Sequence, residues 1–227
     1  MTSAEGLVLV DKPAGVTSHD MVDAVRRAYR ERSVGHLGTL DPFATGLLVL
    51  LLGRATRLAT FIDVEPKVYE ARIDFGNETD TDDVTGTVTA SAQLPDADSI
   101  RAALGTLTGE FAQVPPAYSA KQVAGRRAYE AARAGTALEL APVKVRVHEW
   151  EVRSLTPDRL EATITCGSGT YVRALARDLG RLAGSAAHLA ALRRSRVGDF
   201  RVEDAATLEQ LRTSPPLPRR LRVIADA

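Results

Sequence analysis

The sequence predicts an α+β fold in which helices flank a largely antiparallel mixed sheet. First, three long segments alternate apolar and polar residues, as strands with one solvent-facing side do: residues 69–75, 143–152 and 160–166. Second, helical patterns are interspersed among these strand patterns. Alternating strands are typical of antiparallel sheets, whose two faces differ in exposure. Together the two observations favour a sheet covered in part by helices.

The chain begins with a short apolar strand, residues 7–10, which ends in the turn sequence DKPAG. Thr17 or Ser18 can cap the helix that follows, which we expect to run to about Arg32. The apolar residues of this helix fall on one face: Met21, Val22, Val25, Ala28 and Tyr29. A helix that is apolar on one side only is expected to cover the sheet.

The middle of the chain continues the mixed order. The run GLLVLLLG, residues 46–53, predicts a buried strand, and a short helix is expected over residues 54–62. The strand at 69–75 leads into a polar, acidic loop, GNETDTDDVTG, residues 76–86. Residues 97–107 then predict a further helix.

The C-terminal half contains a break in strand periodicity. Apolar residues alternate up to Val147, and then the phase shifts to Trp150 and Val152. Such a shift within one strand predicts a β-bulge near His148. After the strand at 160–166, the turn sequence GSGT leads into a helix expected from Tyr171 to about Leu182.

Residues 113–140 differ from the rest and predict a basic insertion. Its basic residues are Lys121, Arg126, Arg127 and Arg133, against the two acids Glu130 and Glu139. Tyr118 and Tyr129 are interleaved with them, and a short helix is expected from about Arg127. Basic residues with aromatics suit phosphate contact and base stacking. A solvated surface helix has the same composition, so the pattern alone leaves both interpretations open.

The composition is that of a globular protein, with 44% hydrophobic residues and a formal net charge of zero. A globally basic nucleic-acid binder is therefore not indicated, although residues 171–196 hold six arginines and one acid, which predicts a local basic face. The lone Cys166 excludes an intramolecular disulfide, and we expect it to fill the core. No signal peptide or membrane-spanning run is visible, so we expect a cytoplasmic protein without a membrane partner.

Common catalytic signatures are missing from the sequence. The histidines have neither metal-ligand spacing nor a cysteine partner, so no metal site is expected: His19, His36, His148 and His188. No GxSxG sequence supports a serine nucleophile. The stretch CGSGTY could hold a phosphate at a helix N-terminus, or it could simply join a strand to a helix.

Asp41 is the remaining candidate for chemistry. It is the only acidic residue between Glu31 and Asp63, in a loop with glycines on either side and directly before the buried strand. An Asp-Pro turn would explain it locally. A carboxylate at such a strand edge needs a cationic partner to stay charged when partly buried, and Arg173 is one candidate.

Several motifs together resemble the TruB family of tRNA pseudouridine synthases. GHLGTLDPFATGLL is similar to the family's signature loop, and LVLVDKPAGVTSHD to its N-terminal stretch. KVYEARIDFGNETDTDDVTG resembles the second motif, and QVPPAYSAKQVAGRRAYEAARAG the RNA-gripping insertion. CGSGTYVRALARDLG and AHLAALRRSRVGDF resemble the last two motifs of the catalytic domain. The order is that of the family, over about residues 7–200.

The resemblance implies a pseudouridine synthase fold and the isomerisation of a uridine in the T-loop of tRNA, conventionally position 55. The reaction needs no group donor and no redox change, so no cofactor is implied. By its motif position Asp41 is the catalytic carboxylate, and Arg173 its partner. The implied substrate-binding residues are Lys12, His36, Tyr69, Tyr171, Arg173 and Leu192, and the implied RNA-binding residues are Lys121, Arg126 and Arg127. The family leaves open whether the carboxylate attacks the uracil ring or assists formation of a glycal.

The expected domain organisation is a catalytic domain over residues 1–200, with the insertion at about 113–140, and a short extension over 201–227 without a full RNA-binding domain. We expect a monomer whose partner is the T-loop of tRNA. Two alternatives stay open: an RNA chaperone that binds tRNA with weak or no catalysis, and a synthase that depends on a guide RNA. A catalytic role for Asp41 separates the first alternative from an enzyme.

Overall fold

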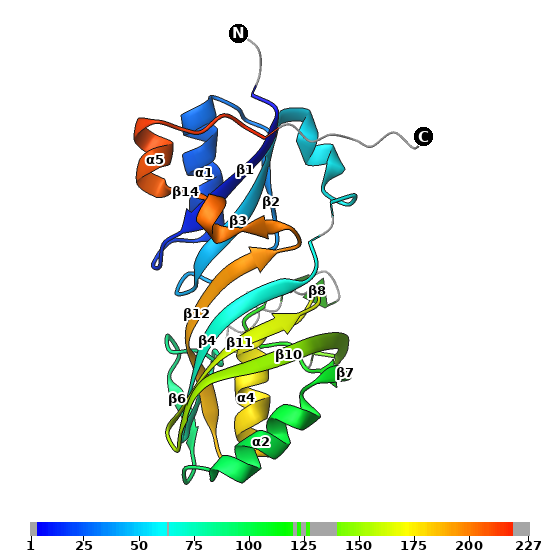
Figure 1. The fold of residues 1–227 in the computed structure, drawn as a ribbon, viewed down its shortest axis with the longest axis vertical. Coiled ribbons are helices and arrows are strands. Elements are labelled where there is room, and N and C mark those ends of the chain that lie inside the picture. The colour runs from blue at the N-terminus through cyan, green and yellow to red at the C-terminus, as the bar shows by residue number, and fades with distance from the viewer. Residues whose placement is uncertain (1–3, 63, 120–121, 124–125, 128–139, 220–227) are drawn as a thin grey trace. The chain divides into compact units, whose positions relative to one another are not determined.

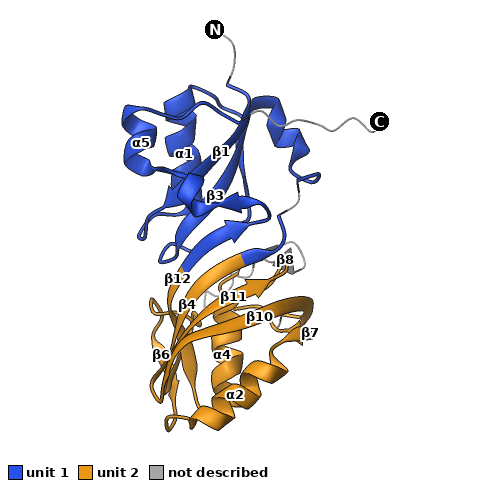
Figure 2. Ribbon diagram, in the orientation of Figure 1, with its two compact units in different colours: residues 1–67, 193–227 blue, residues 68–192 orange. Residues whose placement is uncertain are grey.

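The computed structural model describes residues 4–62, 64–119, 122–123, 126–127 and 140–219. The chain divides into two compact units, residues 1–67 with 193–227 and residues 68–192 (Figure 2). We call these unit 1 and unit 2. In each unit helices pack beside strands (Figure 1), and the main sheet contains both parallel and antiparallel pairs, so the predicted α+β class is confirmed.

Unit 1 is built on the antiparallel pairing of two long strands, β1 and β3. Its elements are β1 (Gly6–Lys12), α1 (Ser18–Tyr29), β2 (Val34–Leu37), β3 (Thr45–Leu52), the 3-10 helix η1 (Gly53–Leu58), the end of β12 (Ala187–Val197), β13 (Phe200–Arg201), η2 (Val202–Asp204), β14 (Ala206–Thr207) and α5 (Leu208–Thr213). β1 and β3 are antiparallel along their length, from Gly6 opposite Leu52 to Lys12 opposite Gly46. β14 pairs with β1 and β12 with β3 in parallel, which makes the sheet mixed.

The run 46–53 is apolar throughout because both faces of β3 are buried. One face carries Leu48, Leu50 and Leu52 and packs on α1. The other face, with Leu47, Val49 and Leu51, packs on residues of η1, η2 and the end of β12. A strand covered on both sides loses the alternation that a half-exposed strand keeps.

The first helix and the elements next to it differ in detail from those predicted from the sequence. Thr17, rather than Ser18, caps α1, and its hydroxyl accepts a hydrogen bond from the Asp20 N–H at 3.0 Å. α1 ends at Tyr29, earlier than expected, because Arg30 turns into the left-handed region at φ 52°. The short helix expected over 54–62 is the 3-10 helix η1, and β2 has no counterpart among the predicted elements.

Unit 2 contains the long alternating strands. Its elements are β4 (Lys67–Phe75), β5 (Asn77–Thr79), β6 (Val88–Ser91), α2 (Ala97–Thr106), β7 (Gly109–Gln113), β8 (Gln122–Val123), β9 (Arg126–Arg127), β10 (Val143–Thr156), β11 (Arg159–Cys166), α4 (Val172–Leu182) and the start of β12. The strand order is β12–β4–β11–β10–β7. Both α2 and α4 lie near the residues predicted for them. The arms of the acidic loop form a small separate sheet, β5 with β6.

The predicted bulge in β10 is confirmed. Pairing between β10 and β11 shifts register between Val147 and Glu149, on either side of His148. A second shift lies between Val152 and Ser154. The extra residues explain why the apolar phase changes within one continuous strand.

Cys166, at the end of β11, is fully buried, as expected of a core residue. Within the part of the chain that the structure describes, no helix is long and apolar enough to cross a membrane. The same residues contain no cluster of three or more His, Cys, Asp or Glu side chains that could hold a metal ion. The helix expected from about Arg127 falls largely on residues 128–139, which lie outside the described residues.

Candidate active site

The loop that carries Asp41 joins β2 to β3 in unit 1 and is tied down on both sides. Before Asp41, the buried Ser18 hydroxyl donates to the Leu40 carbonyl at 3.0 Å and accepts from the Leu40 N–H at 2.9 Å. After Asp41, the Pro42 carbonyl accepts from the Gly15 N–H at 2.8 Å. Asp41 itself is half-buried. The start of α1 and the turn after β1 therefore fix the loop from outside.

Lys12 is a buried ammonium beneath this loop. Its side chain is fully buried, and Nζ donates to the carbonyls of Val16 at 2.7 Å, Pro13 at 3.0 Å and Pro42 at 3.2 Å. Burial lowers the pKa of Lys12 to about 8, while the nearby Asp41 carboxylate acts in the opposite direction. Lys12 thus uses its three donors on backbone carbonyls and lies within electrostatic reach of Asp41.

Arg194 holds the other side of the loop, and the sequence analysis missed it. Its buried guanidinium donates to the carbonyls of Leu47 at 2.8 Å, Gly38 at 3.0 Å and Thr39 at 3.4 Å. In the parallel pairing of β3 with β12, Gly46 lies very close to the Arg194 backbone. A Cβ at position 46 would be 2.7 Å from the backbone nitrogen of Arg194. The available signals were Gly46 at the head of an apolar run and the pair of arginines after Leu192.

His36 lies in β2, half-buried. Burial, together with the charge of Arg194, lowers the pKa of His36, which favours the neutral imidazole. Its Nδ1 is buried and has no hydrogen-bond partner among the described residues.

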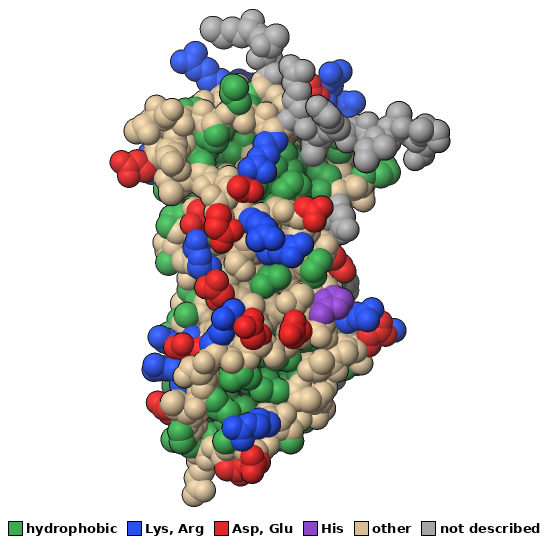
Figure 3. Space-filling model, viewed as in Figure 1, with side chains coloured by type: hydrophobic (Ala, Val, Ile, Leu, Met, Phe, Trp, Pro, Cys, Tyr) green, Lys and Arg blue, Asp and Glu red, His purple; other side chains and the backbone are tan. Residues whose placement is uncertain are grey.

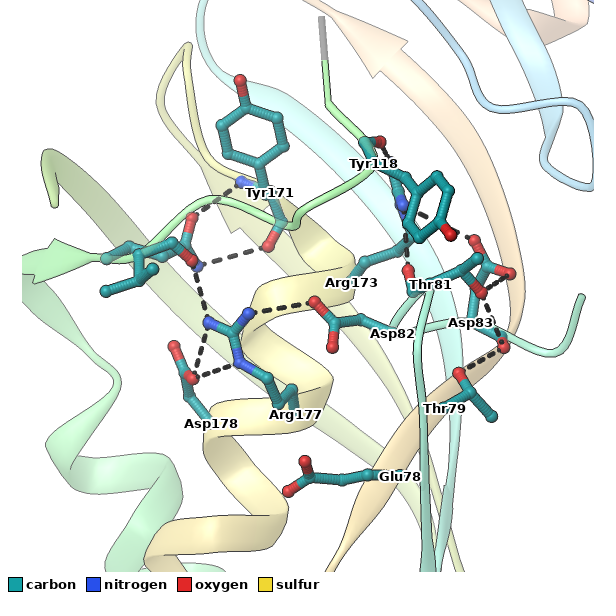
Figure 4. Close-up of polar contacts among 12 residues, drawn as sticks. Glu78, Thr79, Thr81, Asp82, Asp83, Tyr118, Tyr171, Arg173, Arg177 and Asp178 are labelled. Carbon is teal, nitrogen blue, oxygen red and sulfur yellow. Dashed lines mark hydrogen bonds and ion pairs between the residues drawn. The ribbon is translucent and has the colours of Figure 1, made fainter. Parts of the chain in front are cut away.

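In unit 2, Arg173 lies in the first turn of α4 and reaches the acidic loop. Its guanidinium donates to the carbonyls of Thr81 and Tyr118, each at 2.9 Å, and approaches the Asp83 carboxylate at 3.7 Å (Figure 4). Asp83 in turn accepts from the hydroxyl of Thr81 at 2.8 Å and from the N–H of Thr85 at 2.9 Å. Arg173 is only 6% exposed, so its orientation is set by these contacts.

The other predicted residues of unit 2 lie on α4 and on two strands. Tyr171 caps α4, and its backbone N–H and carbonyl both bond the Gln113 side chain, at 2.9 and 3.2 Å. Its ring projects away from the helix (Figure 4). Tyr69 is a buried residue of β4, and Leu192 a buried residue of β12.

Two further residues of unit 2 were not anticipated, Asp82 and Arg177. Asp82 Oδ2 accepts from Arg177 at 2.9 Å, and both side chains are buried (Figure 4). Burial raises the pKa of Asp82 to about 6, against the attraction of Arg177, Arg173 and Arg181. Sequence reasoning could not pair residues so far apart in the chain.

The predicted site residues therefore fall into two groups. Unit 1 brings together Asp41 and Lys12, with His36 on the preceding strand. Unit 2 carries Tyr69, Tyr171, Arg173 and Leu192. The pairing of Asp41 with Arg173 would join the two units and stays a prediction.

The predicted RNA-binding residues belong to the insertion. Lys121 lies outside the described residues, as do the side chains of Arg126 and Arg127, whose backbone forms β9 and pairs with β8. On the face drawn in Figure 3, described Lys and Arg side chains are interspersed with Asp and Glu side chains. The local basic face expected from residues 171–196 stays a prediction. Several of those arginines have carboxylate partners, including Arg177, Arg181 and Arg193.

Comparisons with known proteins give a consistent result. Residues 26–172 match the family model of the TruB pseudouridylate synthase N-terminal domain, and residues 173–215 match that of the tRNA pseudouridylate synthase B C-terminal domain. The chain is 50% identical over 218 residues to the tRNA pseudouridine synthase B of Thermobifida fusca (strain YX), covering 92% of this chain and 74% of that protein. It is 49% identical to the protein of the same name from Arthrobacter sp. (strain FB24), covering 91% of this chain and 70% of that protein.

Solved structures agree on the fold. A chain in a crystal structure of a Cbf5–Nop10–Gar1 complex superposes with a TM-score of 0.68 at 27% identity, over 90% of this chain and 53% of that chain. A chain in an H/ACA RNP bound to a substrate RNA containing 2′-deoxyuridine gives a TM-score of 0.66 at 26% identity, over 90% of this chain. This chain spans about half the length of each of these two. The matches support the predicted pseudouridine synthase fold.

Proposed function

The chain belongs to the TruB family of pseudouridylate synthases, and from that premise we propose that it isomerises a uridine in the T-loop of tRNA to pseudouridine, with Asp41 as the catalytic carboxylate. The reaction breaks the N1–C1′ bond of the nucleotide, turns the uracil and joins C5 to C1′. The proton that C5 carried leaves to solvent, and N1 gains one. Atoms and electrons balance without a donor or an oxidant, which agrees with the sequence expectation that no cofactor is needed.

The observation that carries the proposal is the way in which unit 1 holds the Asp41 loop. Lys12 and Arg194 are buried cations that donate to backbone carbonyls of the loop or its flanks, among them Gly38 and Pro42. Such a loop keeps its carboxylate in one place, as a nucleophile or base requires. The ammonium of Lys12 also lies within electrostatic reach of Asp41.

The residues of unit 2 have roles that fit this chemistry. Tyr69 is placed by its motif to stack on the target base, and Tyr171 and Leu192 to line the uracil pocket. Arg173 is proposed as the cationic partner of Asp41. The carbonyls of Thr81 and Tyr118 orient its guanidinium from two sides.

The target uridine must leave the folded T-loop to reach Asp41. Unstacking and flipping a nucleotide typically costs a few kcal/mol. Contacts from the basic insertion, including Lys121, Arg126 and Arg127, and stacking by aromatics can offset that cost. We further propose that the protein acts as a monomer in the cytoplasm.

The test is tritium release from a tRNA transcript labelled with [5-³H]uridine, without any guide RNA. Wild type should release tritium, and a transcript in which the T-loop uridine is cytidine should release none above background. Asp41→Asn preserves the shape of the side chain and should lower the single-turnover rate by at least about a thousandfold.

Each alternative predicts a different pattern. A chaperone would bind the transcript tightly and release no tritium. A guide-dependent synthase would release tritium only after a guide RNA is added. Release that persists in Asp41→Asn would remove this residue from the chemistry while leaving the activity in place.

A further inference from the structure

Three arginines lie one helical turn apart along α4, and each faces an acidic residue of the acidic loop, residues 76–86. Arg173 faces Asp83, Arg177 faces Asp82 and Arg181 faces Glu78. The spacing of four residues places the three side chains on one side of the helix. Figure 4 shows the first two together with the loop that carries their partners.

The pair Arg177–Asp82 is more deeply buried than the pair Arg181–Glu78. The side chains of Arg177 and Asp82 are 9% and 10% exposed, whereas the Arg181 side chain is 59% exposed. Besides Asp82, the Arg177 guanidinium donates to Asp178 at 2.9 Å and to the Val114 carbonyl at 2.8 Å. Burying a charged pair removes favourable hydration, so the pair adds little to the free energy of folding. Its contribution is to hold the segments that carry the two residues in one arrangement.

The backbone of Asp82 is also unusual. Its φ of 60° lies in the left-handed region, which residues other than glycine and asparagine or aspartate avoid. The Asp82 carbonyl accepts from the Leu189 N–H at 3.0 Å, and the Leu189 carbonyl accepts from the Val84 N–H at 3.0 Å. The acidic loop is therefore pinned to β12 by its backbone and to α4 by the Asp82 side chain.

Arg177 reaches a third segment, the root of the insertion, which we define as residues 113–119. Gln113 bonds the Tyr171 backbone, the Val114 carbonyl bonds Arg177, and the Tyr118 carbonyl bonds Arg173. The first two turns of α4 thus hold the root at three points. Two of these points are arginines that also contact the acidic loop.

We propose that the pair Asp82–Arg177 positions Arg173 for the reaction, by holding the acidic loop and the root of the insertion together against α4. Because the Tyr118 carbonyl accepts from Arg173, a displacement of the root would also displace Arg173. The neighbouring pair keeps both segments in register with the helix. Asp82 and Arg177 touch neither substrate nor Asp41 in this proposal, which rests on the proposed function; they are positioning residues.

The first experiment separates rate from binding in single turnovers on the labelled tRNA transcript. Asp82→Asn removes the charge and keeps a residue that tolerates a left-handed backbone, and Arg177→Gln removes the cation. We expect each to slow tritium release by about tenfold to a hundredfold, as small misplacements of a reacting group do. The dissociation constant for the transcript should change less than about threefold.

The matched control is Arg181→Gln, which removes the exposed arginine one turn further along α4. Its rate should stay within about twofold of wild type. If Asp82 and Arg177 act as one device, the double variant should be no slower than the slower single variant. Additive effects, or rates equal to those of the control, would overturn the proposal.

A second measurement does not depend on catalysis. Hydrogen exchange in peptides covering residues 79–85 and 113–119 should accelerate in Asp82→Asn and Arg177→Gln, while peptides from α1 should exchange as in wild type. Unchanged exchange in both segments would refute the positioning role even if the chain proved inactive on tRNA. Loss of tritium release in wild type, by contrast, would count against the proposed function alone.

Discussion

Buried cations are the residues that fix distant backbone segments in this protein. Lys12, Arg177 and Arg194 are all less than a tenth exposed, and each donates to main-chain carbonyls remote in sequence. A buried charge without such partners would be strongly unfavourable. Each uses its donors on the main chain, and each joins segments that share no local sequence pattern.

The titration of Lys12 predicts how the reaction rate depends on pH. Burial lowers its pKa from 10.5 to about 8, so the folded protein holds an ammonium below that pH and a neutral amine above it. The amine has fewer donors than the three carbonyls it serves and no longer attracts Asp41. We expect the single-turnover rate on tRNA to fall as the pH rises through about 8.

Comparison of pH–rate profiles with Lys12→Met checks this assignment. Methionine has similar length but no titrating group, so the variant should have a lower plateau and lack the alkaline limb. An alkaline limb of unchanged midpoint in Lys12→Met would assign that titration to another group. Measuring transcript affinity at each pH keeps binding and rate apart.

Asp41 could be predicted as a candidate from its isolated position before a buried strand, and the ordered motifs then implied the roles of Asp41 and Arg173. The sequence could not predict Arg194 or the pair Asp82–Arg177, because their partners lie far along the chain. Arg177 and Asp82 are separated by 95 positions, and Arg194 and Leu47 by 147. No local periodicity relates such residues, so folding alone brings them together.

Among the elements, the N-terminus of α1 couples helix capping to the position of Asp41. Thr17 and Asp20 form a reciprocal capping box. Ser18, which follows Thr17, forms hydrogen bonds with both the N–H and the carbonyl of Leu40. Losing the cap should therefore loosen the helix start and the adjacent loop together. The cap is a local interaction with a consequence at the site.

We expect Thr17→Ala to lower the free energy of unfolding by about 1 kcal/mol, the usual value of an N-cap hydroxyl. Urea unfolding measures this directly. Thr106→Ala is the matched control, because the Thr106 hydroxyl bonds only the Ala102 carbonyl within α2 and alanine is a good helix former. Equal losses in the two variants would contradict a specific capping contribution.

Helices and strands were predictable where one buried face gives the sequence a regular spacing of apolar residues. The alternation over residues 69–75 and the phase change at His148 each correspond to an observed strand feature. β2 and the small strands β5 and β6 were missed, because short strands carry too few residues to establish alternation. The expected helix over 54–62 shrank to η1, since nothing in its sequence supplies an N-cap and the structure has none.

At the scale of the whole molecule, zero net charge means that tRNA affinity must come from local clusters of basic residues. We expect the triple substitution of Lys121, Arg126 and Arg127 by alanine to weaken tRNA binding. It should also reduce the slope of log affinity against log salt by about 2 to 3, since each phosphate contact contributes about 0.7 to 0.9. Filter binding over a salt series provides the measurement.

Three exposed arginines that pair with nearby carboxylates serve as the control. Arg101 pairs with Asp98, Arg153 with Glu151 and Arg159 with Asp74. Replacing them by alanine removes the same formal charge and should leave the salt slope near that of wild type. Equal slopes for both triple variants would indicate a general charge effect and no specific role for the insertion.

The fully buried Cys166 has a practical consequence for watching the molecule at work. Because it is the only cysteine and is shielded from reagents, a cysteine introduced on the surface becomes the single site that a maleimide dye can reach. Val114 is suited to this, since the residue is 44% exposed and it binds Arg177 through its backbone carbonyl. A fluorophore at that position would report, in real time and without altering the native thiol, when RNA arrives and when it departs.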